Sequence, residues 1–303
     1  MRNKLLLPAI VLLVFAGSFL AKWMLGRPDR GGTADSGQCE RIVSLAPSIT
    51  EILFALGAGE NVVGVTRYCS YPPEAAGRSR VGGLFDPNLE KIVSLRPDLV
   101  VMLETNADTP AFEELGLHRL VVSHKNIEGI LESFTTIGRA LEEPAKAERM
   151  VAEIRARLER IERKTASRPR RRVMFSVYRN AGSGSLEEVT VVGGGEGFYN
   201  GVIRAAGGEN ACRNRAVPFP VVSPESILGM NPEVIIDLVR LQTGPKPGRQ
   251  KILADWQQVA DVEAVAGGRV YVLDDDFASI PGPRFILLVE KLARLFHPEA
   301  DWQ

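Results

Sequence analysis

The chain has 303 residues, of which 45% are hydrophobic and 24% charged, an ordinary composition for a globular protein. Its 37 basic residues balance 37 acidic ones, which excludes the strongly basic surface typical of nucleic-acid-binding proteins. A chain of this length usually divides its core between two domains. Three cysteines, Cys39, Cys69 and Cys212, form no CxxC pair and allow one disulfide at most, so buried or idle thiols are expected.

The N-terminal segment has the pattern of a secretory signal. Arg2 and Lys4 precede an apolar run over residues 5–21. That run also reaches the lower limit for a membrane-spanning helix, about 17 to 25 residues. Residues 1–25 are therefore expected to be a signal peptide or a retained anchor, and the polar, Gly-rich residues 26–39 a linker. In either case the folded part should work in the periplasm or extracytoplasmic space, tethered to the inner membrane if the helix is retained.

Short aliphatic runs alternate with helical patterns from residue 40 to residue 142. The predicted strands cover 41–45, 62–66, 98–103 and the run "RLVV" that ends at Val122. Between the first two, "SITEILFALG" places Ile49, Ile52 and Leu56 on one helical face. This alternation predicts a first lobe with a parallel sheet covered by helices.

A long helical pattern follows from Pro144 to Thr165. Its apolar face holds Met150, Ile154, Leu158 and Ile161. Its wet side offers two i, i+4 ion pairs, Glu153 with Arg157 and Glu159 with Arg163. At 1.5 Å per residue such a helix is about 33 Å long, enough to link two domains.

A second series of strands comes after this helix. The predicted strands cover 172–178, 189–192, 233–238 and 269–274. The basic run "SRPRRR" before them is expected to be a solvated helix exit rather than a site for nucleic acid or anionic lipid. The expected organisation is thus a first lobe at 40–142, a linking helix at 143–167 and a second lobe at 168–303.

Two stretches repeat one pattern. "EKIVSLRPDLVV" begins at Glu90 and "ESILGMNPEVII" at Glu225. In each, a short helix runs into a proline that disfavours helix in the residue before it, and the acid and aliphatics that follow form a buried strand. "DPN" and "SPE" are start signals, with Asp86 and Ser223 as N-caps and a proline at the first helical position. Both lobes are therefore expected to contain the same helix-to-strand unit.

Three longer stretches carry a family resemblance. They are "RIVSLAPSITEILFALGAGENVVGVTRYCSYPPEA", "VGGLFDPNLEKIVSLRPDLVV" and "VYVLDDDFASIPGPRFILLVEKLARLFHPE". They resemble the periplasmic substrate-binding proteins of ABC importers for cobalamin and iron chelates, in consistent order over residues 40–298. The resemblance implies a class III periplasmic binding protein: two α/β lobes, each with a mostly parallel sheet flanked by helices, joined by one long α-helix. The ligand would lie in the cleft between the lobes.

Within that family, "GVTRYCSYPPEA" and the terminal "GPR" are most similar to the cobalamin receptors. The resemblance implies a first-lobe wall of Tyr68, Leu84, Phe85 and Leu103, and a facing wall of Phe219 with the loop Asp276-Phe277-Ala278-Ser279. A large planar macrocycle is held mostly by apolar and aromatic surface. Cobalamin receptors line the cleft with several tryptophans, whereas Leu84, Leu103 and Phe219 stand at the matching positions here. A corrinoid is therefore the expected ligand, with a ferric siderophore or haem as the alternative.

The resemblance also gives the glutamates a role. In this family one surface glutamate on each lobe docks onto arginines of the two permease subunits, and Glu90 and Glu225 match those positions. A pair of carboxylates related in this way suits a partner with two-fold symmetry. Without a partner, a glutamate in the first turn simply favours the positive end of the helix dipole. Glu74 in "YPPEA" is a lesser docking candidate, and the receptor itself is expected to be a monomer.

Other chemistries fit the sequence poorly. "VVGGGEGFYNG" fails the G-x-G-x-x-G spacing of a phosphate loop, and is expected instead to let a helix pack closely on a strand. "AGSGSLEE" is not a nucleophile elbow, so no catalytic residue and no enzyme activity is expected. The three histidines, His118, His124 and His297, are expected to be surface residues rather than metal ligands, and no cofactor is expected. A membrane-anchored ligand sensor on the same fold is the alternative from a different functional class.

Overall fold

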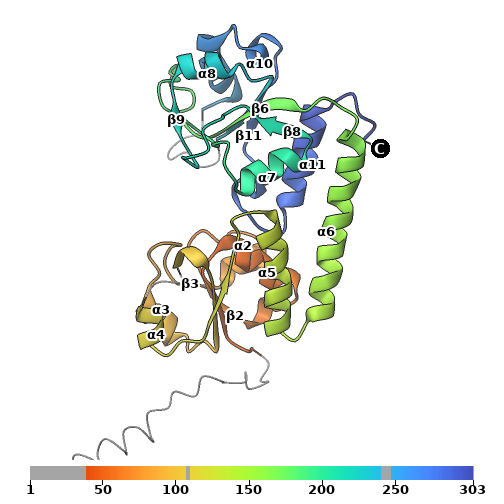
Figure 1. Ribbon diagram of the computed structural model, residues 1–303. Helices are drawn as coiled ribbons and strands as arrows, with labels where there is room; N and C mark the ends of the chain where they lie inside the picture. Colours follow the sequence, from red (N-terminus) through yellow and green to blue (C-terminus); the bar gives the residue numbers. More distant parts are fainter. Residues whose placement is uncertain (1–38, 107–109, 240–246, 303) are drawn as a thin grey trace, which may run out of the picture. The chain divides into compact units, whose positions relative to one another are not determined.

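The computed structural model describes residues 39–106, 110–239 and 247–302. From Cys39 onward the chain forms one compact unit of two α/β lobes, which confirms the predicted fold class (Figure 1). The predicted signal or anchor and nearly all of the linker lie outside the described residues. Within the described part, no helix is both long and apolar enough to span a membrane.

The first lobe is built on a five-stranded parallel sheet in the order β3-β2-β1-β4-β5. Its strands are β1 Ile42–Ser44, β2 Val62–Val65, β3 Ser79–Arg80, β4 Leu99–Leu103 and β5 Arg119–Val122. Its helices are α2 Pro47–Ala55, α3 Leu89–Ser94, α4 Ala111–Glu114 and α5 Ile127–Ala140. The central strands β1 and β4 are buried on both faces, which is why they read as continuous aliphatic runs.

The second lobe has a mixed six-stranded sheet in the order β11-β10-β6-β7-β9, with β8 also paired to β6. Its strands are β6 Arg171–Tyr178, β7 Val189–Val191, β8 Gly208–Asn210, β9 Val221–Val222, β10 Val234–Leu238 and β11 Val270–Leu273. Its helices are α7 Phe198–Ala205, α8 Pro224–Met230, α9 Arg249–Asp255, α10 Glu263–Ala266 and α11 Phe285–Phe296. Strands β10, β11 and β8 join in parallel, whereas β7 and β9 run antiparallel to their neighbours.

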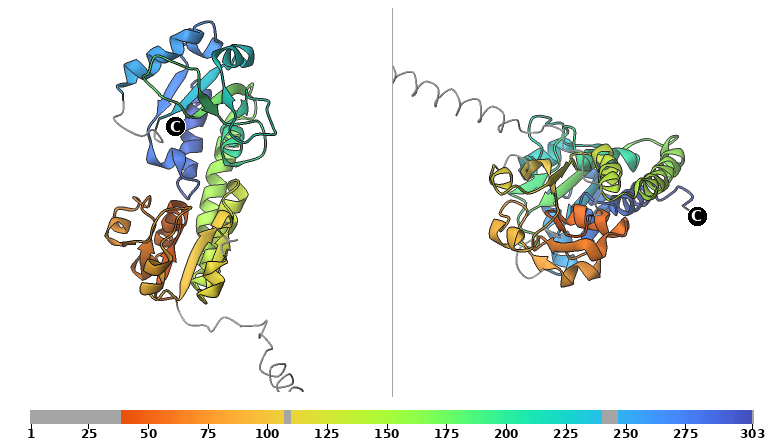
Figure 2. Two further views of the ribbon diagram at one scale, coloured as in Figure 1. Left: turned by 90° about the vertical axis from the view of Figure 1, so that its left-hand side faces the viewer. Right: turned by 90° about the horizontal axis from the view of Figure 1, so that it is seen from below.

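The linking helix α6 spans Pro144–Thr165, the range that the apolar spacing predicts. Figures 1 and 2 show it beside α5 of the first lobe and α11 of the second. One of the two predicted ion pairs is wrong. Arg157 binds not Glu153 but Glu290 of α11, with Nε–Oε1 and Nη2–Oε2 distances of 2.8 and 2.7 Å. The planar guanidinium of Arg157 makes two hydrogen bonds to the Glu290 carboxylate. This two-bond geometry is stronger than a single contact with Glu153 on the same helix. Glu159 and Arg163 do pair, at 3.8 Å.

A single apolar cluster runs through both lobes and the helix between them. It contains Ile52 of α2 and Phe134 of α5, Ile154 of α6, and Phe285 of α11, all buried. Continuous packing of this kind resists bending between the lobes, since any hinge motion would open gaps in a close-packed interior.

The repeated helix-to-strand units have equivalent structures. Helix α3 leads to Pro97 and β4, and α8 leads to Pro232 and β10. Ser223 caps α8 as predicted, but the predicted cap Asp86 is wrong. Asn88 caps α3 instead, accepting a hydrogen bond from the Lys91 backbone N–H at 2.8 Å. Pro87 cannot open the helix because it forms a β-bridge with Gly82.

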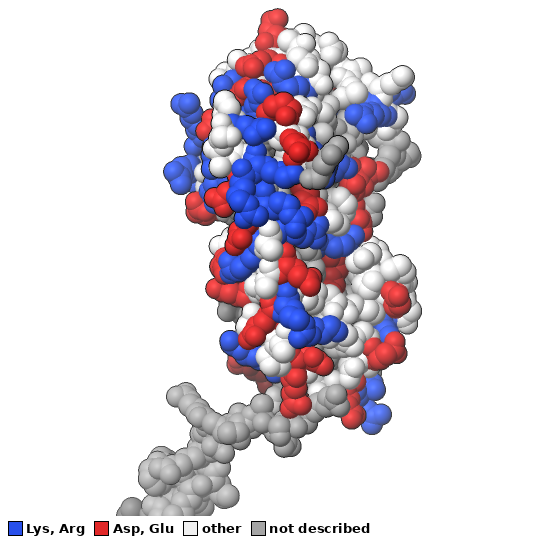
Figure 3. All heavy atoms as spheres, turned by 90° about the vertical axis from the view of Figure 1, so that its right-hand side faces the viewer, with Lys and Arg blue, Asp and Glu red and all other residues white. Residues whose placement is uncertain are grey.

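The basic run at 167–172 follows α6 and forms a charged surface with several ion pairs. Figure 3 shows Lys and Arg side chains gathering where α6 meets the second lobe, with acidic side chains among them. Arg171 and Arg172 both pair with Glu233, and Arg168 pairs with Glu299. These carboxylates offset the positive charge, in line with the interpretation of this run as a solvated helix exit.

Candidate functional site

Two cavities lie between residues of the two lobes and share the wall formed by Ser279 and Pro281. The cavity around Tyr68 and Leu103 lies at the carboxyl ends of the parallel strands β1, β2, β4 and β11, where open α/β sheets bind ligands, whereas much of the other cavity is lined by the loop after the antiparallel strand β7. We call the first the apolar compartment and the second the glycine-loop compartment. Their common wall is the loop that follows β11, so a ligand in either compartment would contact this loop.

The apolar compartment has a volume of about 460 Å³. It is lined by Tyr68, Leu84, Phe85 and Leu103 from the first lobe and by Asp276 and Ile280 from the second. Leu84 and Leu103 rest against the core, while 55% of Tyr68 and 80% of Phe85 are exposed. The four first-lobe residues named from the sequence therefore lie together, and the rings of Tyr68 and Phe85 are exposed to solvent.

The glycine-loop compartment has a volume of about 560 Å³ and lies mainly in the second lobe. Its lining includes Gly195, Tyr199, Arg215 and Phe219, with His124 from the first lobe. Phe219, the remaining aromatic named from the sequence, is half exposed here. The sequence thus identified residues of one cleft, but these residues belong to two compartments.

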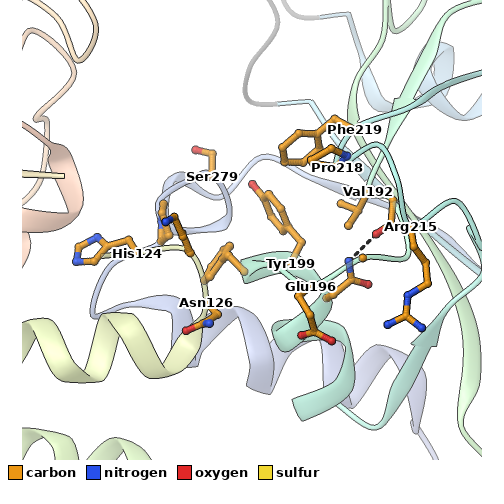
Figure 4. A pocket seen from close by; sticks show the side chains of 16 residues that line it. His124, Asn126, Val192, Glu196, Tyr199, Arg215, Pro218, Phe219 and Ser279 are labelled. Atoms are coloured by element: carbon orange, nitrogen blue, oxygen red, sulfur yellow. Dashed lines mark hydrogen bonds between the residues drawn. The ribbon is translucent and has the colours of Figure 1, made fainter. Parts of the chain in front are cut away.

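Tyr199 is the central aromatic side chain of the glycine-loop compartment. In Figure 4 its ring lies between Ser279 and Phe219. It makes an edge contact with Phe219 at a centroid distance of 6.5 Å and a tilted contact with Phe175 at 4.9 Å. Its hydroxyl donates to the Ala278 carbonyl at 3.2 Å, and burial raises the pKa of the phenol. Tyr199 is therefore a neutral, fixed support for Phe219.

The glycines of residues 193–195 fit against the loop 212–218, not against a helix as the sequence suggested. A Cβ on Gly193 would lie 2.1 Å from the Val217 carbonyl oxygen, and one on Gly194 would lie 2.4 Å from the Cys212 carbonyl oxygen. Such distances exclude any side chain. The glycines therefore let two backbone segments approach closely, and this contact holds Arg215 and Phe219 at the compartment.

His124 and His297 are buried, so the expectation that all three histidines lie at the surface is wrong; only His118 is exposed. His124 Nδ1 lies 2.8 Å from Ser48 Oγ of α2, and its ring points away from Tyr199 in Figure 4. Burial lowers the pKa of His124 to about 4, and its Nε2 has no hydrogen-bond partner among the described residues. The ring is therefore neutral at pH 7 and connects β5 to α2. No group of three His, Cys, Asp or Glu in the described part could hold a metal ion.

An ion-pair cluster lies beneath the shared wall. Arg284 of the second lobe donates to both oxygens of Glu51 in α2, and its Nη1 donates to Asp276 Oδ2 at 2.7 Å. Its guanidinium carbon lies 3.8 Å from the centroid of the Tyr71 ring. Gly282 permits this approach, since a Cβ there would be 3.1 Å from Ser48 Cα. The cluster joins the lobes at the base of the cleft.

The cluster changes the interpretation of Asp276 and Phe277. Asp276 lines the apolar compartment, but its oxygens already accept bonds from Arg284 and from the Phe277 backbone N–H. Phe277 packs against the core and lines neither cavity, because the helical turn at 276–279 directs it inward. The contribution of Phe277 to the cleft is thus to anchor the loop. The roles of Tyr199 and His124 and the pairing of Arg284 with Glu51 were not predicted from the sequence, although the "GPR" motif includes Arg284.

The named glutamates are all exposed and lie outside the cleft. Glu90 is in the first turn of α3 and Glu225 in the first turn of α8. A hydrogen bond from Ser223 lowers the pKa of Glu225, so this carboxylate is charged at neutral pH. Glu74 lies in a short 3₁₀ turn after Pro73. The three cysteines of the described part are free thiols.

Comparison with known proteins agrees with this geometry. A family model described as "Periplasmic binding protein" matches residues 42–277. An uncharacterized ABC transporter substrate-binding lipoprotein of Bacillus subtilis, YvrC, is 30% identical over 268 residues, which are 86% of this chain and 81% of the relative. A vitamin B12-binding protein of Vibrio cholerae is 28% identical over 257 residues, 84% of this chain and 87% of the relative.

Solved structures show the same fold. The apo periplasmic heme-binding protein RhuT from Roseiflexus is similar with a TM-score of 0.72 at 27% identity, and the match covers 86% of this chain and 99% of that one. The family match and the relatives extend across both lobes and the linking helix. The chain therefore belongs to the periplasmic binding protein family, as an extracytoplasmic substrate-binding protein of ABC transporters that catalyses no reaction itself.

Proposed function

We propose that this protein captures a corrinoid such as cobalamin between its lobes and delivers it to an ABC permease in the membrane. The observation that carries the proposal is the apolar compartment, where Tyr68 and Phe85 present exposed rings beside Leu84 and Leu103. A large macrocycle would cover these rings, and burying apolar area contributes about 25 cal/mol per Å². The vitamin B12-binding relative from Vibrio cholerae supports this ligand class.

The second compartment supports a ligand with polar substituents. Its lining holds Arg215 and Lys125, the carboxylate of Glu196, and the amides of Asn126 and Asn200, and Lys125 is paired with Glu104. A corrin ring carries amide side chains and a nucleotide tail, whereas the two propionates of haem would also suit the basic groups. The heme-binding structural relative makes haem the alternative ligand.

Ligand binding should need little closure of the lobes. Helix α6 is continuous, and the apolar cluster and the Arg284–Glu51 pair both cross from one lobe to the other. Two flexible connecting strands would allow a large hinge motion; one helix with these contacts allows only small changes of angle.

We assign Glu90 and Glu225 as the docking points for the two permease subunits. Both are exposed, one on each lobe, and neither has an ion pair among the described residues. Two carboxylates in equivalent positions fit a partner in which two subunits repeat one basic site.

A titration experiment tests the ligand assignment. Purified protein is titrated with cobalamin, cobinamide, haem and ferric siderophores while Trp and Tyr fluorescence is followed. We expect cobalamin to bind with a Kd in the low micromolar range or below. If haem binds and the corrinoids do not, the corrinoid assignment is wrong. If none binds below about 10 μM, the receptor function itself is contradicted.

A charge-reversal experiment tests docking separately. The double variant Glu90→Lys, Glu225→Lys should abolish stimulation of the importer's ATPase and leave ligand affinity unchanged. Glu153→Lys is the matched control, because it reverses an exposed glutamate of α6, outside the two helices. Normal stimulation by the double variant would refute the assignment.

A further inference from the structure

The equivalence of α3 and α8 extends along the whole helix-to-strand unit. Asn88 and Ser223 cap the two helices by accepting from the backbone N–H three residues on, at 2.8 and 3.4 Å. In the residue directly before each proline the backbone is left-handed: φ is 46° at Arg96, before Pro97, and 40° at Asn231, before Pro232. The two helices therefore begin with the same kind of cap and are followed by the same left-handed residue.

The acid after each proline fixes the unit to its sheet in the same way. Asp98 Oδ2 accepts from the Arg41 backbone N–H at 2.8 Å, beside β1. Glu233 Oε2 accepts from the Arg172 backbone N–H at 2.9 Å, in β6. In each lobe the neighbouring parallel strand is thus held at its start by this carboxylate.

The two helices bury and expose side chains at matching positions. Ile92 and Ile227 are fully buried and face their cores. One residue later, Val93 is 40% exposed and Leu228 is 42% exposed. Each aliphatic lies three residues after a docking glutamate, and residues three apart are neighbours on a helix surface.

Single exposed aliphatics are common on protein surfaces and need no explanation. Here the same pair recurs on both lobes, Glu90 with Val93 and Glu225 with Leu228. Figure 1 shows α3 and α8 on the same side of the described unit, away from α6. One partner could therefore contact both pairs at once.

The first lobe adds an open groove beside its pair. The groove has a volume of about 600 Å³ and is lined by Leu89, Val93 and Leu115, with Glu90 and Glu114 at its rim. An apolar floor with a carboxylate rim suits a long basic side chain, whose aliphatic stem covers apolar surface while its head stays polar.

We propose that each lobe is recognised through a carboxylate–aliphatic pair, Glu90 with Val93 and Glu225 with Leu228, by one subunit of a two-fold permease that presents a cationic side chain next to an apolar one. This inference rests on the docking role of the glutamates and extends it to the two aliphatic residues. The cation neutralises the carboxylate, and the apolar neighbour excludes water from the pair, which strengthens the charge interaction.

The test uses the ABC importer from the same organism whose ATPase the ligand-loaded wild-type protein stimulates. The importer is reconstituted in lipid nanodiscs, and its affinity for the receptor is measured along with ATPase stimulation. The variants are Val93→Ser with Leu228→Ser, and Glu90→Gln with Glu225→Gln. Matched controls are Val121→Ser and Leu287→Ser, which remove exposed aliphatics of similar exposure, 39% and 37%, elsewhere on the two lobes.

We expect both double variants to bind the importer at least tenfold more weakly, while the controls and the receptor's own affinity for its ligand stay unchanged. If only the glutamate variant is weakened, docking by the carboxylates stands and the role of the aliphatics is overturned. If neither is weakened, this face is not the docking surface. If the wild-type protein itself binds no ligand, the receptor function is contradicted instead. Failure of the docking proposal and failure of the receptor function can therefore be distinguished.

Discussion

Arg284 of the second lobe holds Glu51 of the first in a two-bond ion pair, with Nη2–Oε1 and Nε–Oε2 distances of 2.6 and 3.0 Å. Only 2% of the Glu51 side chain and 14% of the Arg284 side chain are exposed. The contact lies beneath the loop that separates the two compartments. The structure of the cleft therefore depends on this buried ion pair.

Replacing Arg284 by alanine should destabilise the protein by about 3 kcal/mol, because it leaves the Glu51 carboxylate buried without a cation. Arg284→Lys keeps the charge but loses the two-bond geometry, so it should cost less. Urea unfolding measures both. In the Arg284→Ala background, Glu51→Gln should recover part of the loss; no recovery would show that the pair does not account for it.

The same variant should have a distinctive pH dependence. Burial raises the pKa of Glu51 above its ordinary value of 4.5, and Arg284 opposes that rise. Without Arg284 the pKa rises further, so the native state binds a proton that the unfolded state releases, and stability increases as pH falls toward that range. The stability difference between Arg284→Ala and wild type should therefore be smaller at pH 5 than at pH 8. A difference that does not change with pH would contradict this account.

His124 should make the protein less stable in acid. Its pKa falls from 6.5 to about 4 on folding, so the unfolded state binds the proton more readily, and stability is lost as pH falls from 6.5 toward 4. The loss attributable to this residue is about 2 to 3 kcal/mol. Urea unfolding of His124→Gln at pH 7 and pH 4.5 should show a smaller difference than wild type. His118→Gln, which changes an exposed histidine, is the control and should retain the wild-type difference.

The exposed rings of the cleft should contribute to ligand binding without stabilising the fold. We expect Tyr68→Ala and Phe219→Ala each to weaken binding of the ligand found by titration about tenfold, the effect of roughly 1.4 kcal/mol of lost contact. Tyr178→Ala is the matched control, since Tyr178 is 49% exposed and lines neither compartment. Calorimetry measures affinity. An unchanged affinity for both cleft variants would place the ligand elsewhere.

Arg96 and Asn231, which both have a positive φ before a proline, should respond differently to replacement by glycine. Arg96→Gly relieves the strain of a positive φ, partly offset by the greater flexibility of the unfolded chain, for a net gain of about 0.5 kcal/mol. Asn231→Gly removes the bond that the Asn231 side chain accepts from the Glu263 backbone N–H at 2.9 Å, and should cost about 1 kcal/mol. Thermal unfolding of the pair distinguishes them. Equal effects would mean that the asparagine side chain contributes nothing.

The fold was predictable where its signals are local. Strands β1, β4, β6 and β10 are aliphatic runs buried by their neighbours, and the helix from Pro144 to Thr165 shows its period directly. The short strands β8 and β9 were missed, since "GEN" and "VV" become strands only by pairing with β6 and β7. Strand β7 runs antiparallel because it follows β6 through the loop 179–188 with no helix between them, so the chain turns back beside β6.

The sequence by itself determined two α/β lobes, the linking helix and the repeated helix-to-strand unit, because spacing and prolines specify these, whereas the candidate cleft residues came from the family resemblance. Tertiary structure alone decided that Arg157 binds Glu290, that Asn88 rather than Asp86 caps α3, and that His124 is buried. It also divided the cleft into two compartments and joined Arg284 to Glu51. Each of these depends on which segments meet across long separations in sequence, and a charged or polar side chain takes the partner that burial and geometry bring within hydrogen-bond distance.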